Sequence, residues 1–411
     1  MLRILSIIGT RPEAIKMAPV IRELERHPQQ ACSIVCVTGQ HRQMLDPVLA
    51  LFGIEADCDL DLMQPDQSLS HLTAELFRGL DTVVRDHAPG WILAQGDTTS
   101  VMVGAMVAFY HRIPFGHVEA GLRTGDRYQP FPEEVNRRIA DSLSEILFAP
   151  TPRSRDRLLQ EGISASKIIV TGNTIVDALK EVAAMPVDLS AGPLAGLPLD
   201  QPLVLVTAHR RESFGGQLQE ICLAVRELAS TFESAGVHFV YPVHLNPNVR
   251  RPAHDLLSGL ANVHLLDPLD YRSLVQVMKR SILVLTDSGG IQEEAPGLGI
   301  PVLVMRNTTE RPEGVEAGVA RLVGTRRSRI VREAASLLQS PERRSTMVSA
   351  SNPYGDGQAA QRIVGRLLGK PVPAGAEWTP GGPSNRDGIV PIRTAGPAPS
   401  VSLGTWDCSR R

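Results

Sequence analysis

One stretch of the chain, residues 282–305, constrains the fold more than any other. Its sequence, ILVLTDSGGIQEEAPGLGIPVLVM, predicts a buried apolar strand over 282–286, a glycine turn, a short helix and a second strand over 300–305. Asp287 and Ser288 are helix N-cap residues, so the helix is expected to begin directly after them. Strand, turn and helix in this order form the repeating unit of a parallel α/β sheet, which binds ligands at its carboxyl edge.

The glycine turn of this stretch has the features of an anion site. Ser288, Gly289 and Gly290 would present free N–H groups and the positive end of a helix dipole to a phosphate. Glu294, nearly two turns into the helix, could accept hydrogen bonds from ribose hydroxyls. An ordinary βα turn with a capped helix explains the same residues, and this stretch alone leaves both interpretations open.

Short apolar strands alternate with helices through the rest of the chain, which predicts two doubly wound parallel α/β domains. A chain of 411 residues is also too long for one core. The segment 183–202 is rich in Pro, Gly and Ala and divides a first domain, 1–182, from a second, 183–355. Residues 370–411 show no helix or strand periodicity, and we expect a disordered tail there. The other expected strands are 3–9, 33–38, 91–94, 114–118, 146–150, 168–171, 203–207, 238–242 and 263–266.

Composition narrows the class of protein. A net charge of −2 gives no reason to expect nucleic acid, so local positive charge must bind any anionic ligand. Five scattered cysteines without CxxC or zinc-ligand spacing predict reduced thiols in a cytoplasmic protein, and no metal site. The apolar run at the start is too short for a signal peptide, and no apolar stretch approaches the roughly 18 residues of a membrane span.

Charged residues in the first domain follow its strands. Arg11 and Lys16 flank a helix expected to start near Pro12, and two cations there favour an anion pocket over a solvated face. Asp97 ends a strand and is either a helix cap or a reacting carboxylate. Glu119 ends the next strand before small residues, where a carboxylate has little structural purpose.

Two further groups in the first domain allow a structural interpretation. Glu133 and Glu134 lie in a first helical turn, where acids are favourable in any case. They become candidates for the site only because a third carboxylate close to Asp97 and Glu119 could take part in the same chemistry. The start of another helix carries polar residues that suit either a domain cleft or a solvated surface; these are Gln40, His41 and Gln43.

The second domain offers further candidates for phosphate contacts. His209 ends a strand and is followed by Arg-Arg-Glu, an electropositive setting that favours phosphate contact over a core role. His244 follows the next strand and suits either role, and Arg311 lies in a polar loop from which it could reach phosphate.

Several strings in the sequence closely resemble the non-hydrolysing UDP-N-acetylglucosamine 2-epimerases. They are GTRPEAIKMAPV, TGQHRQMLD, QGDTTS, GHVEAGLRTG, PFPEEVNRR, TGNTIVDAL, HRRESFG, YPVHLNPNV, LTDSGGIQEEAPGLG, TTERPEGVEAG and NPYGDGQA. Their order is that of the family, and they cover residues 1 to about 368. The resemblance implies two domains of glycosyltransferase-B type, an active site in the interdomain cleft, a homodimer, and C-terminal helices near 356–369 that pack back on the first domain.

The resemblance also implies an activity and residue roles. The expected reaction is the reversible epimerisation of UDP-N-acetylglucosamine (UDP-GlcNAc) at C2 to UDP-N-acetylmannosamine (UDP-ManNAc), without a cofactor, for surface polysaccharide synthesis. Asp97, Glu119 and Glu133 would transfer protons, and His209 would act at the diphosphate. The residues implied to bind the nucleotide sugar are Arg11, Lys16, His244, Ser288, Gly289, Gly290, Glu294 and Arg311. Those implied to bind a second UDP-GlcNAc as activator are Gln40, His41, Gln43 and Arg210.

Rival functions stay open at this point. A glycosyltransferase on the same fold would need an acceptor site, and a hydrolysing epimerase would release free ManNAc. A non-catalytic UDP-sugar sensor would have no need of the candidate acids and bases. An epimerase for a modified sugar, such as a 2,3-diacetamido uronic acid nucleotide, would share all of them.

Overall fold

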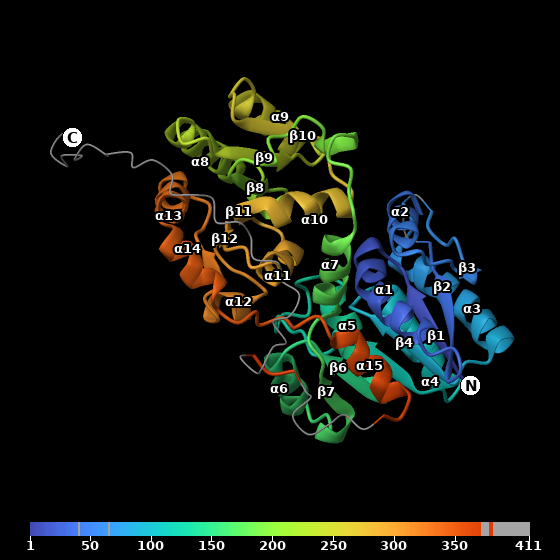
Figure 1. Ribbon diagram of the computed structural model, residues 1–411. Coiled ribbons are helices and arrows are strands. Elements are labelled where there is room, and N and C mark those ends of the chain that lie inside the picture. Colours follow the sequence, from blue (N-terminus) through green and yellow to red (C-terminus); the bar gives the residue numbers. More distant parts are fainter. Residues whose placement is uncertain (40–41, 65, 371–377, 381–411) are drawn as a thin grey trace. The chain divides into compact units, whose positions relative to one another are not determined.

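The computed structural model describes residues 1–39, 42–64, 66–370 and 378–380, and it divides into two compact units (Figure 1). Unit 1 comprises Met1–Pro186, Asp270–Val275 and the C-terminal segment from Ser351. Unit 2 comprises Val187–Leu269 and Gln276–Ala350. Each unit holds one wholly parallel sheet whose inner strands are buried on both faces, as expected of doubly wound domains.

The sheet of unit 1 has the order β3-β2-β1-β4-β5-β6-β7. Chain order therefore reverses between the neighbours β1 and β4, which makes the loops after these two strands the expected ligand-binding position. The strands are β1 (Leu2–Ile8), β2 (Ala31–Val37), β3 (Cys58–Asp59), β4 (Trp91–Gln95), β5 (Phe115–Val118), β6 (Ile146–Ala149) and β7 (Ile168–Val170).

Several helices of unit 1 begin at polar caps, and amphipathic ones such as α3 bury one apolar stripe. In α3 the stripe runs at helical spacing from Leu72 through Leu76 to Leu80, and Ser68 caps the first turn by accepting from the His71 N–H at 3.2 Å. Helix α1 packs on α2, α7 and α15, while α4 packs on α3 and α5. The helices are α1 (Arg11–Glu25), α2 (Arg42–Phe52), α3 (Leu69–His87), α4 (Thr99–Tyr110), α5 (Glu133–Leu143), α6 (Pro152–Gln160), α7 (Thr174–Ala184) and α15 (Ala359–Leu367).

The sheet of unit 2 has the order β10-β9-β8-β11-β12-β13, so its reversal lies between β8 and β11. Its strands are β8 (Leu203–Thr207), β9 (His238–Pro242), β10 (Val263–Leu266), β11 (Ser281–Thr286), β12 (Val302–Val304) and β13 (Ala320–Leu322). Its helices are α8 (Gly216–Phe232), α9 (Pro247–Leu257), α11 (Gly289–Gly297), α12 (Pro312–Glu316), α13 (Arg327–Gln339) and α14 (Pro341–Val348). The residues of α10 (Tyr271–Arg280) are divided between the two units.

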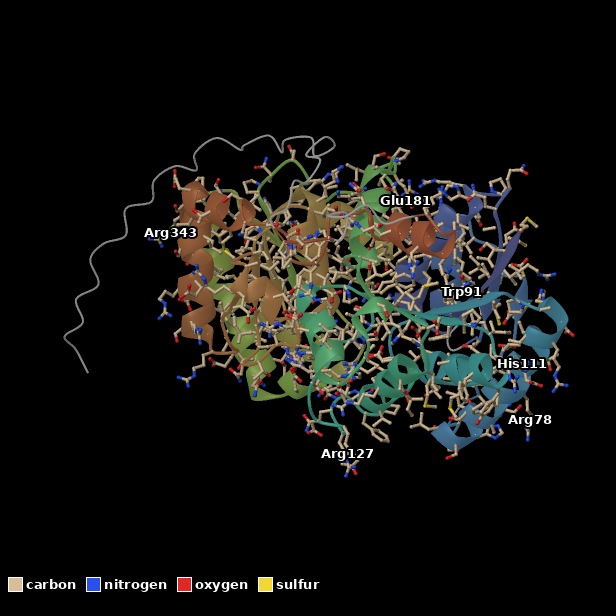
Figure 2. The ribbon with its side chains drawn as sticks, turned by 90° about the horizontal axis from the view of Figure 1, so that it is seen from below. Arg78, Trp91, His111, Arg127, Glu181 and Arg343 are labelled. Carbon is tan, nitrogen blue, oxygen red and sulfur yellow. The ribbon has the colours of Figure 1, made fainter. Side chains whose placement is uncertain are left out.

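Most of the secondary structure expected from the sequence is present. The strands expected at 3–9 and 282–286 are β1 and β11, and the helix expected to start near Pro12 starts at Arg11. The sequence pattern missed β3 and β13, because these short strands, unlike β7 and β12, do not lie in a continuous apolar run. Charged side chains such as Arg78, Arg127 and Arg343 are exposed at the periphery (Figure 2).

The C-terminal segment of unit 1 is held by side chains of α7. Asp177 caps α15 by accepting from the Ala360 N–H at 2.9 Å and the Ala359 N–H at 3.3 Å. Most of the predicted disordered tail lies outside the described residues. Trp378 within it differs from that prediction, because its side chain is buried and its N–H donates to the carbonyl of Val170 at 3.1 Å. No helix of the described ranges is long and apolar enough to cross a membrane.

Candidate active site

The predicted site residues follow strands at or beside the reversal point of each sheet. In unit 1, Lys16 lies on the helix after β1, Asp97 follows β4 and Glu119 follows β5. In unit 2, His209 follows β8 and Ser288 follows β11. Parallel neighbours end at the same edge, so each unit gathers residues that lie far apart in the sequence.

Glu119 is the most constrained of the candidates. Its backbone has a φ of +68°, a left-handed conformation that is uncommon outside glycine, and its side chain is buried. The Lys16 ammonium donates to both carboxylate oxygens, at 2.6 and 2.8 Å. The Gln95 amide donates to Oε2, and the Asn173 amide donates to Oε1 at 3.1 Å. These donors hold a negative charge in one orientation, which is the requirement for a directed proton transfer.

The N-terminus of α1 is already occupied by a carboxylate. Glu13 Oε2 accepts from the Gly9 N–H at 2.6 Å and from the Thr10 N–H at 3.3 Å. Burial raises the pKa of Glu13 to about 7 in spite of these bonds. Within unit 1, Lys16 therefore contacts Glu119 and these N–H groups contact Glu13, whereas Arg11 is exposed. The predicted role of Arg11 and Lys16 in anion binding stays a prediction.

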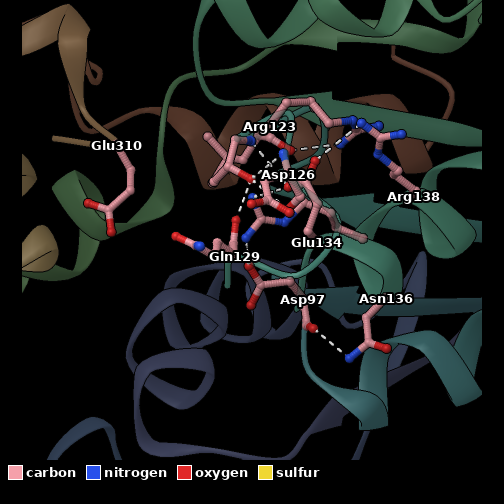
Figure 3. Close-up of polar contacts among 12 residues, drawn as sticks. Asp97, Arg123, Asp126, Gln129, Glu134, Asn136, Arg138 and Glu310 are labelled. Atoms are coloured by element: carbon pink, nitrogen blue, oxygen red, sulfur yellow. Dashed lines mark hydrogen bonds and ion pairs between the residues drawn. The ribbon is translucent and has the colours of Figure 1, made fainter. Parts of the chain in front are cut away.

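Asp97 is bound through both its side chain and its backbone. Its carboxylate accepts from Arg137 Nη2, and its carbonyl accepts from Asn136 Nδ2 at 3.0 Å (Figure 3). The neighbouring Thr98 is the cap of α4, because its hydroxyl accepts from the Val101 N–H. The sequence left open whether Asp97 is a helix cap or a reacting carboxylate. Because Thr98 caps the helix, Asp97 is not needed as the cap.

The two acids at the start of α5 have different environments. Glu134 is fully buried, accepts from the Thr124 N–H at 3.2 Å and pairs with Arg137 and Arg138, each at 3.3 Å (Figure 3). Glu133 is partly exposed, and its buried Oε2 has no hydrogen-bond partner among the described residues. Glu134 therefore braces the loop before α5. Its Oε1 also makes no hydrogen bond among the described residues, but unlike Glu133 Oε2 it lies in an ion pair with Arg138.

A buried charge network lies behind these carboxylates, and the sequence analysis did not find it. His117 in β5 bonds Asp141 Oδ1 through Nδ1 at 2.6 Å and the Gly96 carbonyl through Nε2 at 2.7 Å. Asp141 Oδ2 also accepts from Arg123 at 2.7 Å and from the Gly121 N–H at 3.3 Å. The network therefore braces both the residue before Asp97 and the loop after Glu119.

The pKa shifts in this network keep its charges in place. Burial lowers the pKa of His117, but the Asp141 carboxylate outweighs it, so the net pKa lies above 6.5. Burial raises the pKa of Asp141, but His117 and Arg123 outweigh it and bring the pKa below 3.8. A histidine in an apolar strand two residues before Glu119 was the signal for such a partner, because a buried imidazole needs hydrogen bonds.

Asp287 in unit 2 corrects one detail of the sequence analysis. It was predicted to cap the helix that follows it, but its Oδ2 accepts from the N–H groups of His209 at 2.7 Å and Arg210 at 2.8 Å. The physical reason is that β8 and β11 are neighbours, so the fully buried carboxylate meets the turn after β8. Asp287 Oδ1 lies 3.6 Å from His209 Nδ1, beyond hydrogen-bond distance, so Asp287 holds His209 through its backbone N–H.

The other predicted residues of unit 2 surround the same turn. The rings of His209 and His244 stack with centroids 5.8 Å apart. A Cβ added at Gly289 would lie 3.2 Å from Arg210 Nη2, and one added at Gly290 would lie 3.2 Å from Glu294 Oε1. Glycine at these positions thus permits the close approach of backbone and polar side chains at the N-terminus of α11.

Arg311 and the residues predicted to bind an activator are the remaining candidates for the site. Arg311 Nε donates to the buried carboxylate of Glu293, so it is anchored at α11. Of the residues predicted to bind an activator, Gln40 and His41 lie outside the described residues, as does the side chain of Gln43. No group of three His, Cys, Asp or Glu side chains suited to a metal ion occurs in the described part of the chain.

Comparison with known proteins gives consistent matches over most of the chain. A family model described as UDP-N-acetylglucosamine 2-epimerase matches residues 22–368. The UDP-N-acetylglucosamine 2-epimerase of Escherichia coli O157:H7 is 50% identical over 372 residues, which cover 89% of this chain and 98% of the relative.

Two solved structures extend this likeness to the fold. The UDP-GlcNAc 2-epimerase of Neisseria meningitidis bound to UDP-GlcNAc is 47% identical, with a TM-score of 0.80 and coverage of 90% of this chain and 100% of that one. The enzyme of Methanocaldococcus jannaschii in complex with UDP-GlcNAc and UDP is 30% identical, with a TM-score of 0.73 and the same coverage. The resemblance and the fold class predicted from the sequence are confirmed.

Proposed function

The chain belongs to the UDP-N-acetylglucosamine 2-epimerase family, and on this premise we propose that it interconverts UDP-GlcNAc and UDP-ManNAc by elimination and re-addition of UDP. The observation that carries the proposal is the buried Glu119 carboxylate, held by Lys16, Gln95 and Asn173 beside the turn that bears Asp97. A sugar-nucleotide binder without catalysis would have no use for a charge held so firmly.

The chemistry explains why such carboxylates are needed. The C2 proton of the sugar is not α to a carbonyl, so a base alone cannot remove it. As the C1–O bond breaks, UDP leaves with the electron pair, positive charge develops at C1, and the neighbouring C2–H becomes acidic. Loss of that proton leaves a C1=C2 double bond in a glycal-type intermediate. Protonation of C2 on the opposite face and return of the UDP oxygen to C1 complete the inversion.

We assign the proton transfers to Asp97, Glu119 and Glu133. Glu119 is held in place by its donors, and Glu133 has a buried oxygen without a hydrogen-bond partner among the described residues. Glu134 is left out of the assignment because its oxygens brace Thr124, Arg137 and Arg138.

In this proposal, residues of unit 2 stabilise the leaving diphosphate. The His209 side chain, on a turn that Asp287 holds through backbone N–H groups, supplies a donor, and the N-terminus of α11 supplies the N–H groups of Gly289 and Gly290. Glu294 is suited to ribose hydroxyls, and the proposed anion contacts of His244, Ser288 and Arg311 serve the same ligand.

Further parts of the proposal follow from family membership. The protein acts as a cytoplasmic homodimer without a cofactor, supplies ManNAc units for surface polysaccharide, and binds a second UDP-GlcNAc as activator. Rate would then rise sigmoidally with substrate, and Gln43→Ala would remove the sigmoidal behaviour. Hyperbolic kinetics unaffected by that substitution would refute the activator role.

Proton NMR of the protein with UDP-GlcNAc in heavy water tests the reaction. We expect UDP-ManNAc to appear with deuterium at C2, with no acceptor sugar added. Free ManNAc would indicate hydrolysis instead, and no exchange at C2 would refute the proposal. Glu119→Gln and His209→Asn should each lower kcat at least ~100-fold, because each removes a proton-transferring or charge-stabilising group. The exposed Glu55→Gln and His254→Asn are matched controls that should keep wild-type kcat.

A further inference from the structure

Asn173 joins three parts of unit 1, and besides holding Glu119 it contacts the C-terminal segment of the chain. It is 3% exposed and stands directly before α7. Its side-chain Nδ2 donates to Glu119 Oε1 at 3.1 Å, and its Oδ1 accepts from the Ile175 N–H at 3.1 Å. Its backbone N–H donates to the carbonyl of Tyr354 at 2.6 Å.

The helix cap determines which way the Asn173 amide faces. A side-chain amide has one acceptor oxygen and one donor nitrogen. Because the oxygen is used to cap α7, the nitrogen is directed to the Glu119 carboxylate. Asn173 thus connects the start of a helix with the group proposed to transfer a proton.

The C-terminal segment of the chain holds the backbone of Asn173 in place. Tyr354 is 2% exposed, and the Arg362 side chain ties Asp356, at 2.7 and 2.8 Å, to the Thr171 carbonyl at 3.0 Å. Gly355 has a φ of +144°, and a Cβ there would lie 3.3 Å from the Asn173 nitrogen. The backbones are in such close contact that any displacement of residues 352–356 reaches Asn173.

We propose that Asn173 is a positioning residue for Glu119, and that residues 352–356 hold Asn173 in register with it. The inference rests on the proposed function of Glu119. Glu119 receives contacts from cationic Lys16 on α1, neutral Gln95 on β4 and neutral Asn173. Lys16 supplies charge, and the two amides select one rotation of the carboxylate. Losing one amide would slow the chemical step and leave substrate binding nearly unchanged.

Two substitutions separate this role from the helix cap. Asn173→Ser and Asn173→Asp both keep a good N-cap, but neither can donate to Glu119 as the amide does. We expect kcat to fall about 10-fold in Asn173→Ser, as for loss of one hydrogen bond to a charged group, and about 100-fold in Asn173→Asp, where a second carboxylate faces Glu119. KM should stay within about twofold, and the acidic limb of the pH–kcat profile should move to higher pH in Asn173→Asp.

Gly355→Ala tests the contribution of the C-terminal segment. Its Cβ pushes on the Asn173 backbone, so kcat should fall with little change in KM, as in Asn173→Ser. Gln361→Ala, exposed on α15, is the matched control and should keep wild-type kinetics. A Gly355→Ala variant with wild-type kcat would refute the role of residues 352–356.

The results for the wild type and the variants separate this inference from the proposed function. If the wild type epimerises and Asn173→Asp keeps its kcat and pH profile, the positioning role is wrong and the proposed function stands. A wild type without C2 exchange refutes the function. The ¹³C titration of the Glu119 carboxyl carbon, assigned with Glu119→Gln, needs no substrate. It should shift in Asn173→Asp, and an unchanged titration would overturn the contact itself.

Discussion

The buried network around Asp141 makes the sharpest test of the structural reasoning. Asp141→Asn keeps the shape of the side chain but removes the anion between His117 and Arg123, which lie 2.6 and 2.7 Å from it. Both partners are almost fully buried, at 0% and 3% side-chain exposure. Removing one member of a buried ion pair costs about 3–5 kcal/mol, so we expect the unfolding free energy of unit 1 to fall by about 4 kcal/mol at pH 6.

The pH dependence of this loss has a definite sign. His117 has a raised pKa, so the stability it contributes is fully present below pH 6.5 and is lost as the pH rises through the folded-state pKa. Asp141 has a lowered pKa, so its contribution is present above pH 3.8 and is lost as the pH falls through the folded-state pKa. The substitution should therefore cost most between these values and less once the pH has risen through the folded-state pKa of His117.

Urea unfolding followed by tryptophan fluorescence is the assay, because Trp91 and Trp378 both belong to unit 1. Asp156→Asn is the control: it removes an exposed ion pair with Arg155 and should change the free energy by less than about 0.5 kcal/mol. The C2 exchange rate should also fall at least ~10-fold in Asp141→Asn, since His117 and Gly121 lose their brace beside the proposed catalytic groups. A loss of stability below about 1 kcal/mol at pH 6, or a loss that does not diminish as the pH is raised, would refute the reasoning.

Two further predictions concern other parts of the chain. Burial raises the pKa of Asp177 to about 7, so its stabilising contribution is lost as the pH rises through that value. Asp177→Asn should make the urea midpoint of unit 1 fall less between about pH 5 and 8.5 than in the wild type, and a curve parallel to wild type would contradict this. Gly289→Ala brings a Cβ to 3.2 Å from Arg210 Nη2 and obstructs the N-terminus of α11, so KM for UDP-GlcNAc should rise about 10-fold. The control Gly216→Ala meets nothing within 4 Å at the start of α8, and an equal KM in both variants would refute the anion role of α11.

Short stretches of sequence predicted the strands and helices but not which residues their side chains contact. The apolar run before Asp287 and the glycines after it predicted a strand, a turn and a helix, which are β11 and α11. The same residues suggested that Asp287 caps its own helix, whereas it binds the turn after β8. The error has a physical cause: the strand order β8-β11 decides which turn the carboxylate meets, and sequence spacing carries no information about that order.

Lys16 and Glu119 show the same difference between what the sequence predicts and what the fold brings into contact. Lys16 was singled out because it lies near a helix start and Glu119 because it ends a strand, but their contact at 2.6 Å joins residues 103 positions apart. Asn173 and His117 drew no attention in the sequence, since one resembles a helix cap and the other a buried strand residue. Their significance comes from what they touch: the Glu119 carboxylate in one case and Asp141 in the other.

The class of fold and the family could be predicted from the residues alone, because apolar periodicity, glycine turns and ordered motifs are properties of short stretches of chain. Which charges face one another depends on how the folded chain brings distant residues together. Contacts such as those of Lys16 with Glu119 and of Asp287 with His209 arise where parallel strands distant in the chain end at one edge of a sheet, and hydrogen bonds depend on distances that the order of residues does not specify.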